Sequence, residues 1–171
     1  MDTTVTIGSV MLDAPVMMAS GTAGYGVEMA PFVDLSSIGA IVTKSLAPFE
    51  WAGNPAPRVH PTTQGMMNAV GLQGPGVEHW LVNVLPPLVD TGATVVCSIW
   101  GRSLEDYQLA AEMLADAPPE VVAVEVNLSQ IRMDLDGDDQ VGPDETEQVV
   151  DPAAGAGAVD GRVRRAVGEQ A

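Results

Sequence analysis

Residues 65–78, which read GMMNAVGLQGPGVE, combine side chains suited to gripping a flat small molecule. The amide of Asn68 can both donate and accept hydrogen bonds. Gly71 has no side chain, so a planar ring could approach its backbone closely. Apolar neighbours such as Leu72 would lie against that ring. The pattern therefore predicts a small-molecule site, although a Gly-rich stretch of this kind is equally typical of an ordinary connecting loop.

Lys44 closes an apolar run in the sequence AIVTKS. Lysine is rarely buried without a partner for its charge. At the end of a strand, the ammonium group could attract a carboxylate and stabilise negative charge on a bound ring. In the alternative interpretation the alkyl stem lies along the rim of the protein and the ammonium group simply reaches water.

Four apolar runs bounded by turn residues alternate with helical patterns, which is typical of βα units and a parallel sheet. The predicted strands are residues 15–20, 40–45, 94–99 and 121–129. The carboxyl ends of parallel strands meet at one edge, where barrel enzymes build their active sites. Polar residues that end these strands are therefore expected to converge: Ser20, Lys44, Ser98 and Asn127.

Helices are expected between these strands. The clearest spans residues 103–115, where Ser103 can cap the helix and Asp106 completes a capping box. Its predicted apolar face consists of Leu104, Tyr107, Ala111 and Leu114. A second helix is expected over residues 77–85, ending before two consecutive prolines, and a shorter one over residues 27–33.

Five segments resemble the class 1 dihydroorotate dehydrogenases in the order in which they occur: ASGTAGYG at 19–26, IVTKS at 41–45, GNPAPRV at 53–59, the loop at 65–78 and VNLS at 126–129. The first of them is similar to the class 1B catalytic subunit. This resemblance implies a (β/α)₈ TIM barrel, FMN as cofactor, and oxidation of dihydroorotate to orotate in pyrimidine biosynthesis. It also implies an iron-sulfur flavoprotein partner that passes electrons to NAD.

The resemblance also implies roles for individual residues. The residues that match cofactor-binding positions are Ala19, Ser20, Lys44, Ser45, Ser98 and Asn127. The residues that match substrate-binding positions are Lys44, Asn68, Ala69, Val70, Gly71, Leu72 and Asn127.

The position of the catalytic base departs from the family pattern. After Ser129 the class 1 enzymes have cysteine and the class 2 enzymes serine, whereas this chain has Gln130. Glutamine cannot accept a proton near neutral pH, so no catalytic residue is intact. The sequence thus leaves two interpretations: a dihydroorotate dehydrogenase, or a catalytically silent fragment of one, truncated or frame-shifted near residue 130.

The predicted organisation has two parts. A TIM barrel typically needs about 250 residues, and the chain has 171, so residues 1–129 are expected to hold about the first four βα units. The tail, residues 130–171, has no aromatic residue and ten of the 23 acids, and it is expected to be disordered apart from a weak helical pattern at 144–150. Its residues 134–145 have the acid spacing of a calcium loop, but aspartate replaces the required glycine, and a solvated linker is the alternative.

Composition excludes several functions. With a net charge of -16 and seven basic residues, nucleic acid and anionic membrane are not expected partners. Cys97 is the single cysteine, which favours a reducing compartment. No apolar run reaches 18 residues, and the N-terminus lacks the pattern of a signal peptide, so a cytoplasmic protein is expected. No motif has the spacing of a zinc site, no metal is expected, and a homo-oligomer remains open.

Overall fold

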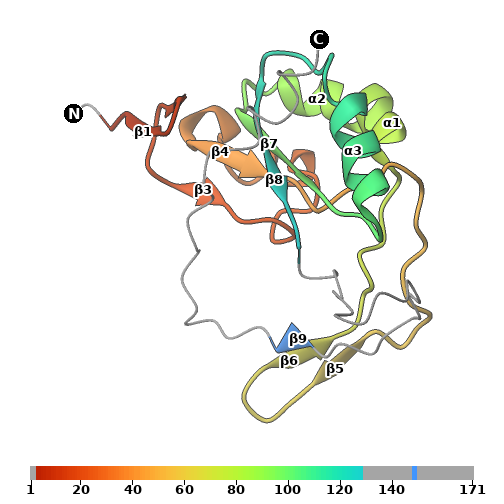
Figure 1. The fold of residues 1–171 in the computed structure, drawn as a ribbon. Helices are drawn as coiled ribbons and strands as arrows, with labels where there is room; N and C mark the ends of the chain where they lie inside the picture. Colours follow the sequence, from red (N-terminus) through yellow and green to blue (C-terminus); the bar gives the residue numbers. More distant parts are fainter. Residues whose placement is uncertain (1–2, 129–147, 150–171) are drawn as a thin grey trace.

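The computed structural model describes residues 3–128 and 148–149 (Figure 1). Its centre is a four-stranded parallel sheet in the order β3-β4-β7-β8, in which strands that follow one another in this series lie side by side. The strands are β3 (Met17–Met18), β4 (Ala40–Val42), β7 (Val95–Ile99) and β8 (Val121–Val126). Each lies inside one predicted run, so the expected parallel sheet of the first βα units is confirmed.

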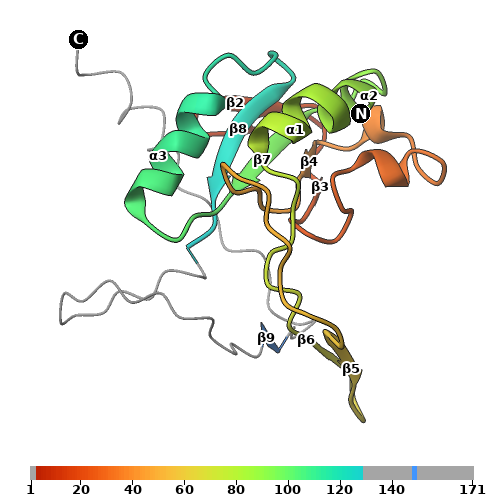
Figure 2. The same cartoon turned by 90° about the vertical axis from the view of Figure 1, so that its right-hand side faces the viewer.

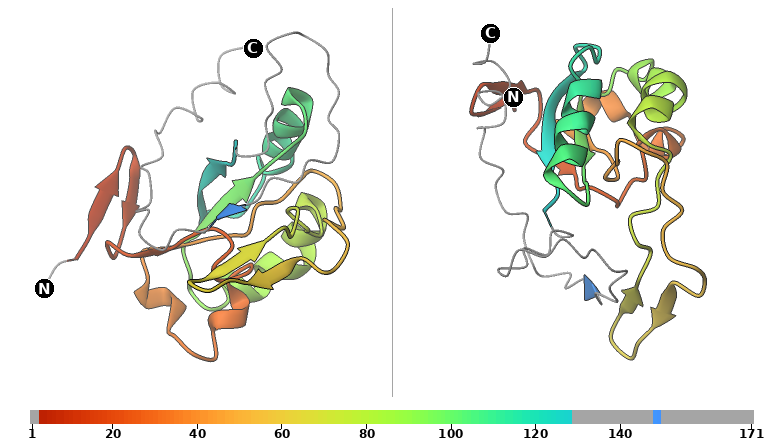
Figure 3. Two further views of the ribbon diagram at one scale, coloured as in Figure 1. Left: turned by 90° about the horizontal axis from the view of Figure 1, so that it is seen from below. Right: turned by 45° about the vertical axis from the view of Figure 1, so that its right-hand side comes forward.

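The helices pack against one face of this sheet (Figures 2 and 3). They are α1 (Val77–His79), the π-helix η3 (Trp80–Val84), α2 (Leu85–Val89) and α3 (Leu104–Met113), with the 3-10 helices η1 (Val27–Met29) and η2 (Leu35–Ser37) on the connections. The core between helices and sheet includes Ile41, Val95, Cys97, Ile99, Trp80, Leu88 and Ala110.

The prediction that the second helix ends before Pro86 and Pro87 is wrong. The helix begins at Val77 as expected, but it continues through both prolines to Val89. Proline disrupts the i→i−4 pairing of an α-helix. Here the preceding turn is a π-helix, in which Leu85 N–H donates to the carbonyl oxygen five residues earlier, at Trp80. Just before the prolines, pairing five residues apart thus replaces the usual pairing four residues apart, and the helix continues past them.

Helix α3 shows a second difference. Ser103 caps it, because its hydroxyl accepts from Asp106 N–H at 3.4 Å. Tyr107 and Leu114 are buried as predicted. Leu104, however, is 69% exposed, and Ala110 is fully buried in place of the predicted Ala111, which is half-buried. Leu104 is the first helical residue, next to the cap, so the buried stripe begins one turn later than the spacing indicated.

A long excursion separates β4 from α1. Residues 47–76, here called the arm, carry the antiparallel pair β5 (Val59–Pro61) and β6 (Met66–Asn68) beyond the carboxyl ends of the strands (Figures 1 and 2). Strand β9 (Gln148–Val149) pairs with β6, although the sequence indicated a weak helix there. A further hairpin, β1 (Val5–Ile7) and β2 (Val10–Leu12), precedes the sheet.

Candidate active site at the strand ends

Side chains at the carboxyl ends join all four strands of the sheet. The Ser20 hydroxyl donates to the Thr43 carbonyl oxygen at 2.8 Å, and Thr43 Oγ1 accepts from Ser98 N–H at 3.1 Å. The hydroxyls of Ser45 and Ser98 share a hydrogen bond of 2.8 Å, and Asn127 Nδ2 donates to Ser45 Oγ at 2.9 Å. The structure therefore brings together Ser20, Ser98 and Asn127, three of the four polar residues that were expected to converge, whereas the side chain of Lys44 makes none of these bonds.

This network is buried. Among the described residues, the polar side chains that are buried are Thr43, Ser45 and Ser98, and all three belong to it. A buried hydroxyl without a partner is costly, so mutual hydrogen bonding is what makes these positions stable. Thr43 was not predicted as a site residue because it was assigned to an apolar run, although a hydroxyl directly before Lys44 was a usable signal.

A second unpredicted contact comes from helix α3. Tyr107 Oη donates to the Asn127 carbonyl oxygen at 2.7 Å. The spacing had placed Tyr107 on the apolar face of its helix, which is where its ring lies. A buried tyrosine normally finds a partner for its hydroxyl, and here that partner is the backbone of a site residue.

Lys44 is half-buried, and its backbone N–H donates to the Gly24 carbonyl oxygen at 2.9 Å. Burial lowers the pKa of its ammonium group, and the positive charge of Arg58 lowers it further. Within residues 3–128 and 148–149, the ammonium group has neither a hydrogen-bond nor an ion-pair partner. Among the described residues no acid offsets these two positive charges, so the surroundings of Lys44 favour an anion.

The loop at residues 69–74, here called the substrate loop, is fixed through its carbonyl groups. The Ala69 and Val70 carbonyl oxygens accept from the side chain and backbone N–H of Asn54, at 2.9 and 3.1 Å. The Gly71 carbonyl oxygen accepts from Trp51 Nε1 at 2.8 Å. Three successive carbonyls thus face the other limb of the arm.

Gly71 and the residue after it have left-handed backbone, with φ of +70° at Gly71 and +53° at Leu72. Their N–H groups donate to no acceptor within the part of the chain that the structure describes. The base of the loop reaches the strand ends, since a Cβ on Gly74 would lie 3.0 Å from the Tyr25 hydroxyl oxygen. Among the described residues, the N–H groups of Gly71 and Leu72 are therefore free, while the carbonyl oxygens of residues 69–71 are occupied.

Other predicted residues lie farther out. Asn68 belongs to β6, opposite Val59 in the arm, and no hydrogen bond among the described residues joins its side chain to the strand-end network. Ala19 is exposed just before Ser20. Gln130, at the expected base position, lies outside the described residues, as do the calcium-like stretch at 134–145 and most of the tail.

Glu125 was not predicted as a site residue from the sequence. It lies on β8 directly opposite Ser98 in the register, and it is half-buried. The strand was interpreted as apolar up to its polar end. A single carboxylate inside a run of valines and alanine is itself unusual, since glutamate is seldom buried without a reason.

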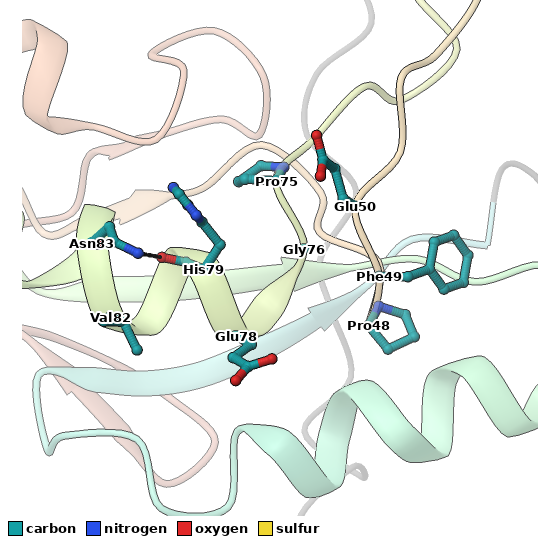
Figure 4. A pocket seen from close by; sticks show the side chains of 9 residues that line it. All are labelled: Pro48, Phe49, Glu50, Pro75, Gly76, Glu78, His79, Val82 and Asn83. Carbon is teal, nitrogen blue, oxygen red and sulfur yellow. Dashed lines mark hydrogen bonds between the residues drawn. The ribbon is translucent and has the colours of Figure 1, made fainter.

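A separate hollow of about 440 Å³ lies between the start of the arm and α1 (Figure 4). Its lining includes Phe49, Glu50, Glu78 and His79, and none of the predicted site residues contributes to it. Two carboxylates make it a poor place for an anion. The hollow therefore does not coincide with the candidate site at the strand ends.

Two further findings concern the described residues. No three His, Cys, Asp or Glu side chains among them are grouped so that they could hold a metal ion. No helix among them combines the length and apolar character needed to cross a membrane.

Comparison with known proteins places this chain in a family. The family profile for dihydroorotate dehydrogenase matches residues 3–147. The catalytic subunit of dihydroorotate dehydrogenase B (NAD(+)) from Geobacter sulfurreducens is 46% identical over 128 residues, which cover 75% of this chain and 42% of that protein. The corresponding subunit from Desulforudis audaxviator is 44% identical over 127 residues, covering 74% and 41%.

The chain thus spans 42% or less of the length of these curated relatives. A solved structure, dihydroorotate dehydrogenase from Eimeria tenella in complex with ferulenol, matches with a TM-score of 0.52 at 16% identity. That match covers 75% of this chain and 37% of the other, and it supports the barrel fold. With the profile match over most of its length, the chain belongs to the dihydroorotate dehydrogenase family.

Proposed function

We propose that this chain acts as a cytoplasmic dihydroorotate dehydrogenase of pyrimidine biosynthesis, oxidising dihydroorotate to orotate with FMN as the hydride acceptor. The names of its relatives, which are catalytic subunits of the NAD-linked B type, support this reaction. The words "NAD(+)" and "catalytic subunit" in those names support a further subunit that carries electrons onward to NAD, and we propose an iron-sulfur flavoprotein for that role.

The observation that carries the proposal is Lys44 at the strand ends, whose ammonium group has no partner among the described residues. Dihydroorotate carries a carboxylate on a ring with carbonyl and N–H groups, and its oxidation to orotate makes that ring planar. Lys44, with Arg58 nearby, offers the positive charge that a carboxylate needs. The free N–H groups of Gly71 and Leu72 offer donors to the ring oxygens. The site therefore has the charge and the hydrogen-bonding character of this substrate.

The strand ends also fit a flavin. Ser45 and Ser98 together have two hydroxyl hydrogens, and only one of them is used in the bond between the two oxygens. One hydrogen therefore remains to donate to a ligand. The residues proposed to hold FMN are Ala19, Ser20, Lys44, Ser45, Ser98 and Asn127. When bound, FMN would supply the acceptor for the hydride from C6 of dihydroorotate, while a base removes the proton from C5.

The second candidate is a catalytically silent fragment that keeps part of the binding site. Gln130 favours it, because glutamine cannot remove the C5 proton. In this interpretation the intact relatives perform the reaction, and this chain folds around its first four strands without turnover. Binding and turnover therefore have to be tested separately.

The test is to load the purified chain with FMN and record its visible absorption before and after anaerobic addition of dihydroorotate. Bleaching of the flavin is the expected result for the enzyme. A flavin that binds and is not bleached would support the silent fragment, and a colourless protein would contradict the proposed FMN site.

Three variants sharpen this test. Lys44→Met should weaken binding of orotate by about tenfold, since a charge-assisted contact is lost, whereas Lys44→Arg should restore most of it. Gln130→Cys supplies a proton acceptor at the family position. Bleaching in this variant alone would identify the missing base as the cause of silence.

A further inference from the structure

The conformation of the substrate loop has to be maintained by its surroundings. Leu72 has φ of +53°, a region that bulky residues rarely occupy, and it follows Gly71 at +70°. Such a conformation persists only when neighbouring contacts determine it strongly. The question is which side chain supplies those contacts.

Trp51 contacts this turn at both ends. Its indole Nε1–H donates to the Gly71 carbonyl oxygen at 2.8 Å. Its backbone N–H and carbonyl oxygen pair with the carbonyl oxygen and N–H of Gly74, each at 2.9 Å. One residue therefore fixes both the start and the end of the left-handed segment.

The Trp51 ring is itself held in place from the loop after β7. The guanidinium carbon of Arg102 lies 3.9 Å from the centre of the Trp51 ring, which is a close cation–π contact. Trp100 meets the same ring in an edge arrangement, with centroids 6.4 Å apart. Arg102 N–H donates to Asp106 Oδ2 at 2.8 Å, which ties this clamp to the start of α3.

We infer that Trp51, clamped by Arg102, is a positioning residue that holds the substrate loop in the conformation presenting the Gly71 and Leu72 N–H groups to a ligand. The identity of that ligand, a planar carboxylate such as orotate, rests on the proposed function. The dependence of the loop conformation on Trp51 does not rest on the proposed function. The clamp also couples the loop after β4 to the loop after β7.

The test uses Trp51→Phe, which keeps an aromatic ring beneath Arg102 and removes the indole N–H. Trp80→Phe is the matched control, because the buried Trp80 Nε1 has no hydrogen-bond partner among the described residues. The same chemical change there deletes no such bond. The readout is hydrogen exchange at the Asn54 and Gly74 amides, both of which bond across the arm, relative to the amides of β7 in the same variant.

Trp51→Phe should raise that relative exchange rate by about five- to tenfold, as expected for one lost hydrogen bond. Trp80→Phe should leave it unchanged even if the whole protein is less stable. Arg102→Met, which removes the cation from the ring face, should raise it by about two- to fivefold. Equal relative rates in Trp51→Phe and Trp80→Phe would overturn the inference.

Orotate binding separates this inference from the proposed function. If the unmodified chain binds orotate, Trp51→Phe should weaken that binding by about five- to tenfold, and Trp80→Phe should not. If the unmodified chain does not bind orotate while Trp51→Phe still accelerates exchange in the arm, the proposed function fails and the positioning role stands. Weaker binding without faster exchange would refute the positioning role.

Discussion

Replacing Ser45 by alanine tests whether the strand-end network is a cooperative unit. Ser45 Oγ is the shared partner of the Ser98 hydroxyl, at 2.8 Å, and of the Asn127 amide, at 2.9 Å. The substitution leaves a fully buried hydroxyl unpaired, which costs about 1–3 kcal/mol. Asn127 is half-buried and can reach water, so its lost bond costs about 0.5–1 kcal/mol. Ser45→Ala should therefore lower the free energy of unfolding by about 1.5–4 kcal/mol.

The double variant gives the sharper result. Once Ser45 is alanine, Ser98→Ala removes the very hydroxyl that was left unpaired, so the second change should cost little. We expect a coupling energy of about 1–2 kcal/mol between the two sites, measured as urea unfolding midpoints at constant m-value. Ser9→Ala, at an exposed position, should stay within about 0.5 kcal/mol of the parent. Additive effects of the two serines would show that the network does not act as a unit.

Three further predictions concern the core and the arm. Burial raises the pKa of the Cys97 thiol to about 12, so a thiol reagent should label the native chain at least about 100-fold more slowly than the chain in urea. Burial also raises the pKa of Tyr25 to about 12. The folded state then holds this proton more tightly than the unfolded state, so its contribution to stability is complete below about pH 10 and is lost as the pH rises towards 12. The fall in urea midpoint between about pH 9 and about pH 11 should therefore be smaller in Tyr25→Phe than in the parent chain. Gly53 and Gly8 both have positive φ, but a Cβ at Gly53 would collide with the Val70 carbonyl oxygen while Gly8 faces open space, so Gly53→Ala should be the more destabilising by about 1 kcal/mol or more in thermal unfolding.

The parallel sheet could be predicted because its strands have a strong local pattern. Residues 94–99 and 121–126 are apolar runs bounded by turn residues, and β7 and β8 lie within them. A parallel arrangement then determines which ends meet, so the convergence of Ser98 and Asn127 followed from topology alone. The site residues on strands were therefore accessible from the sequence.

The path of the arm and the π-helix could not be predicted from the sequence in the same way. The path of residues 47–76 depends on hydrogen bonds between two limbs about 20 residues apart in the chain, such as Trp51 to Gly71 and Asn54 to Val70. No periodic pattern encodes such pairings. The persistence of the helix through Pro86 depends on a widened turn, which tertiary packing of Trp80 and Leu88 stabilises against the local preference of proline.

The proposed function assigns binding and chemistry to different parts of the chain. The strand-end network and the substrate loop are built from residues 20–127, and the hydrogen bonds described above join residues within that range. The proposed base position, residue 130, follows them in the chain. Under the proposed function, a change at that position would remove proton transfer without removing any of these hydrogen bonds. Loss of the serine network or of Trp51 would have the opposite effect, because it would disturb the proposed ligand site while leaving the base position as it is. The proposal therefore expects binding and turnover to respond to different substitutions, so a flavin that binds without bleaching would separate the two.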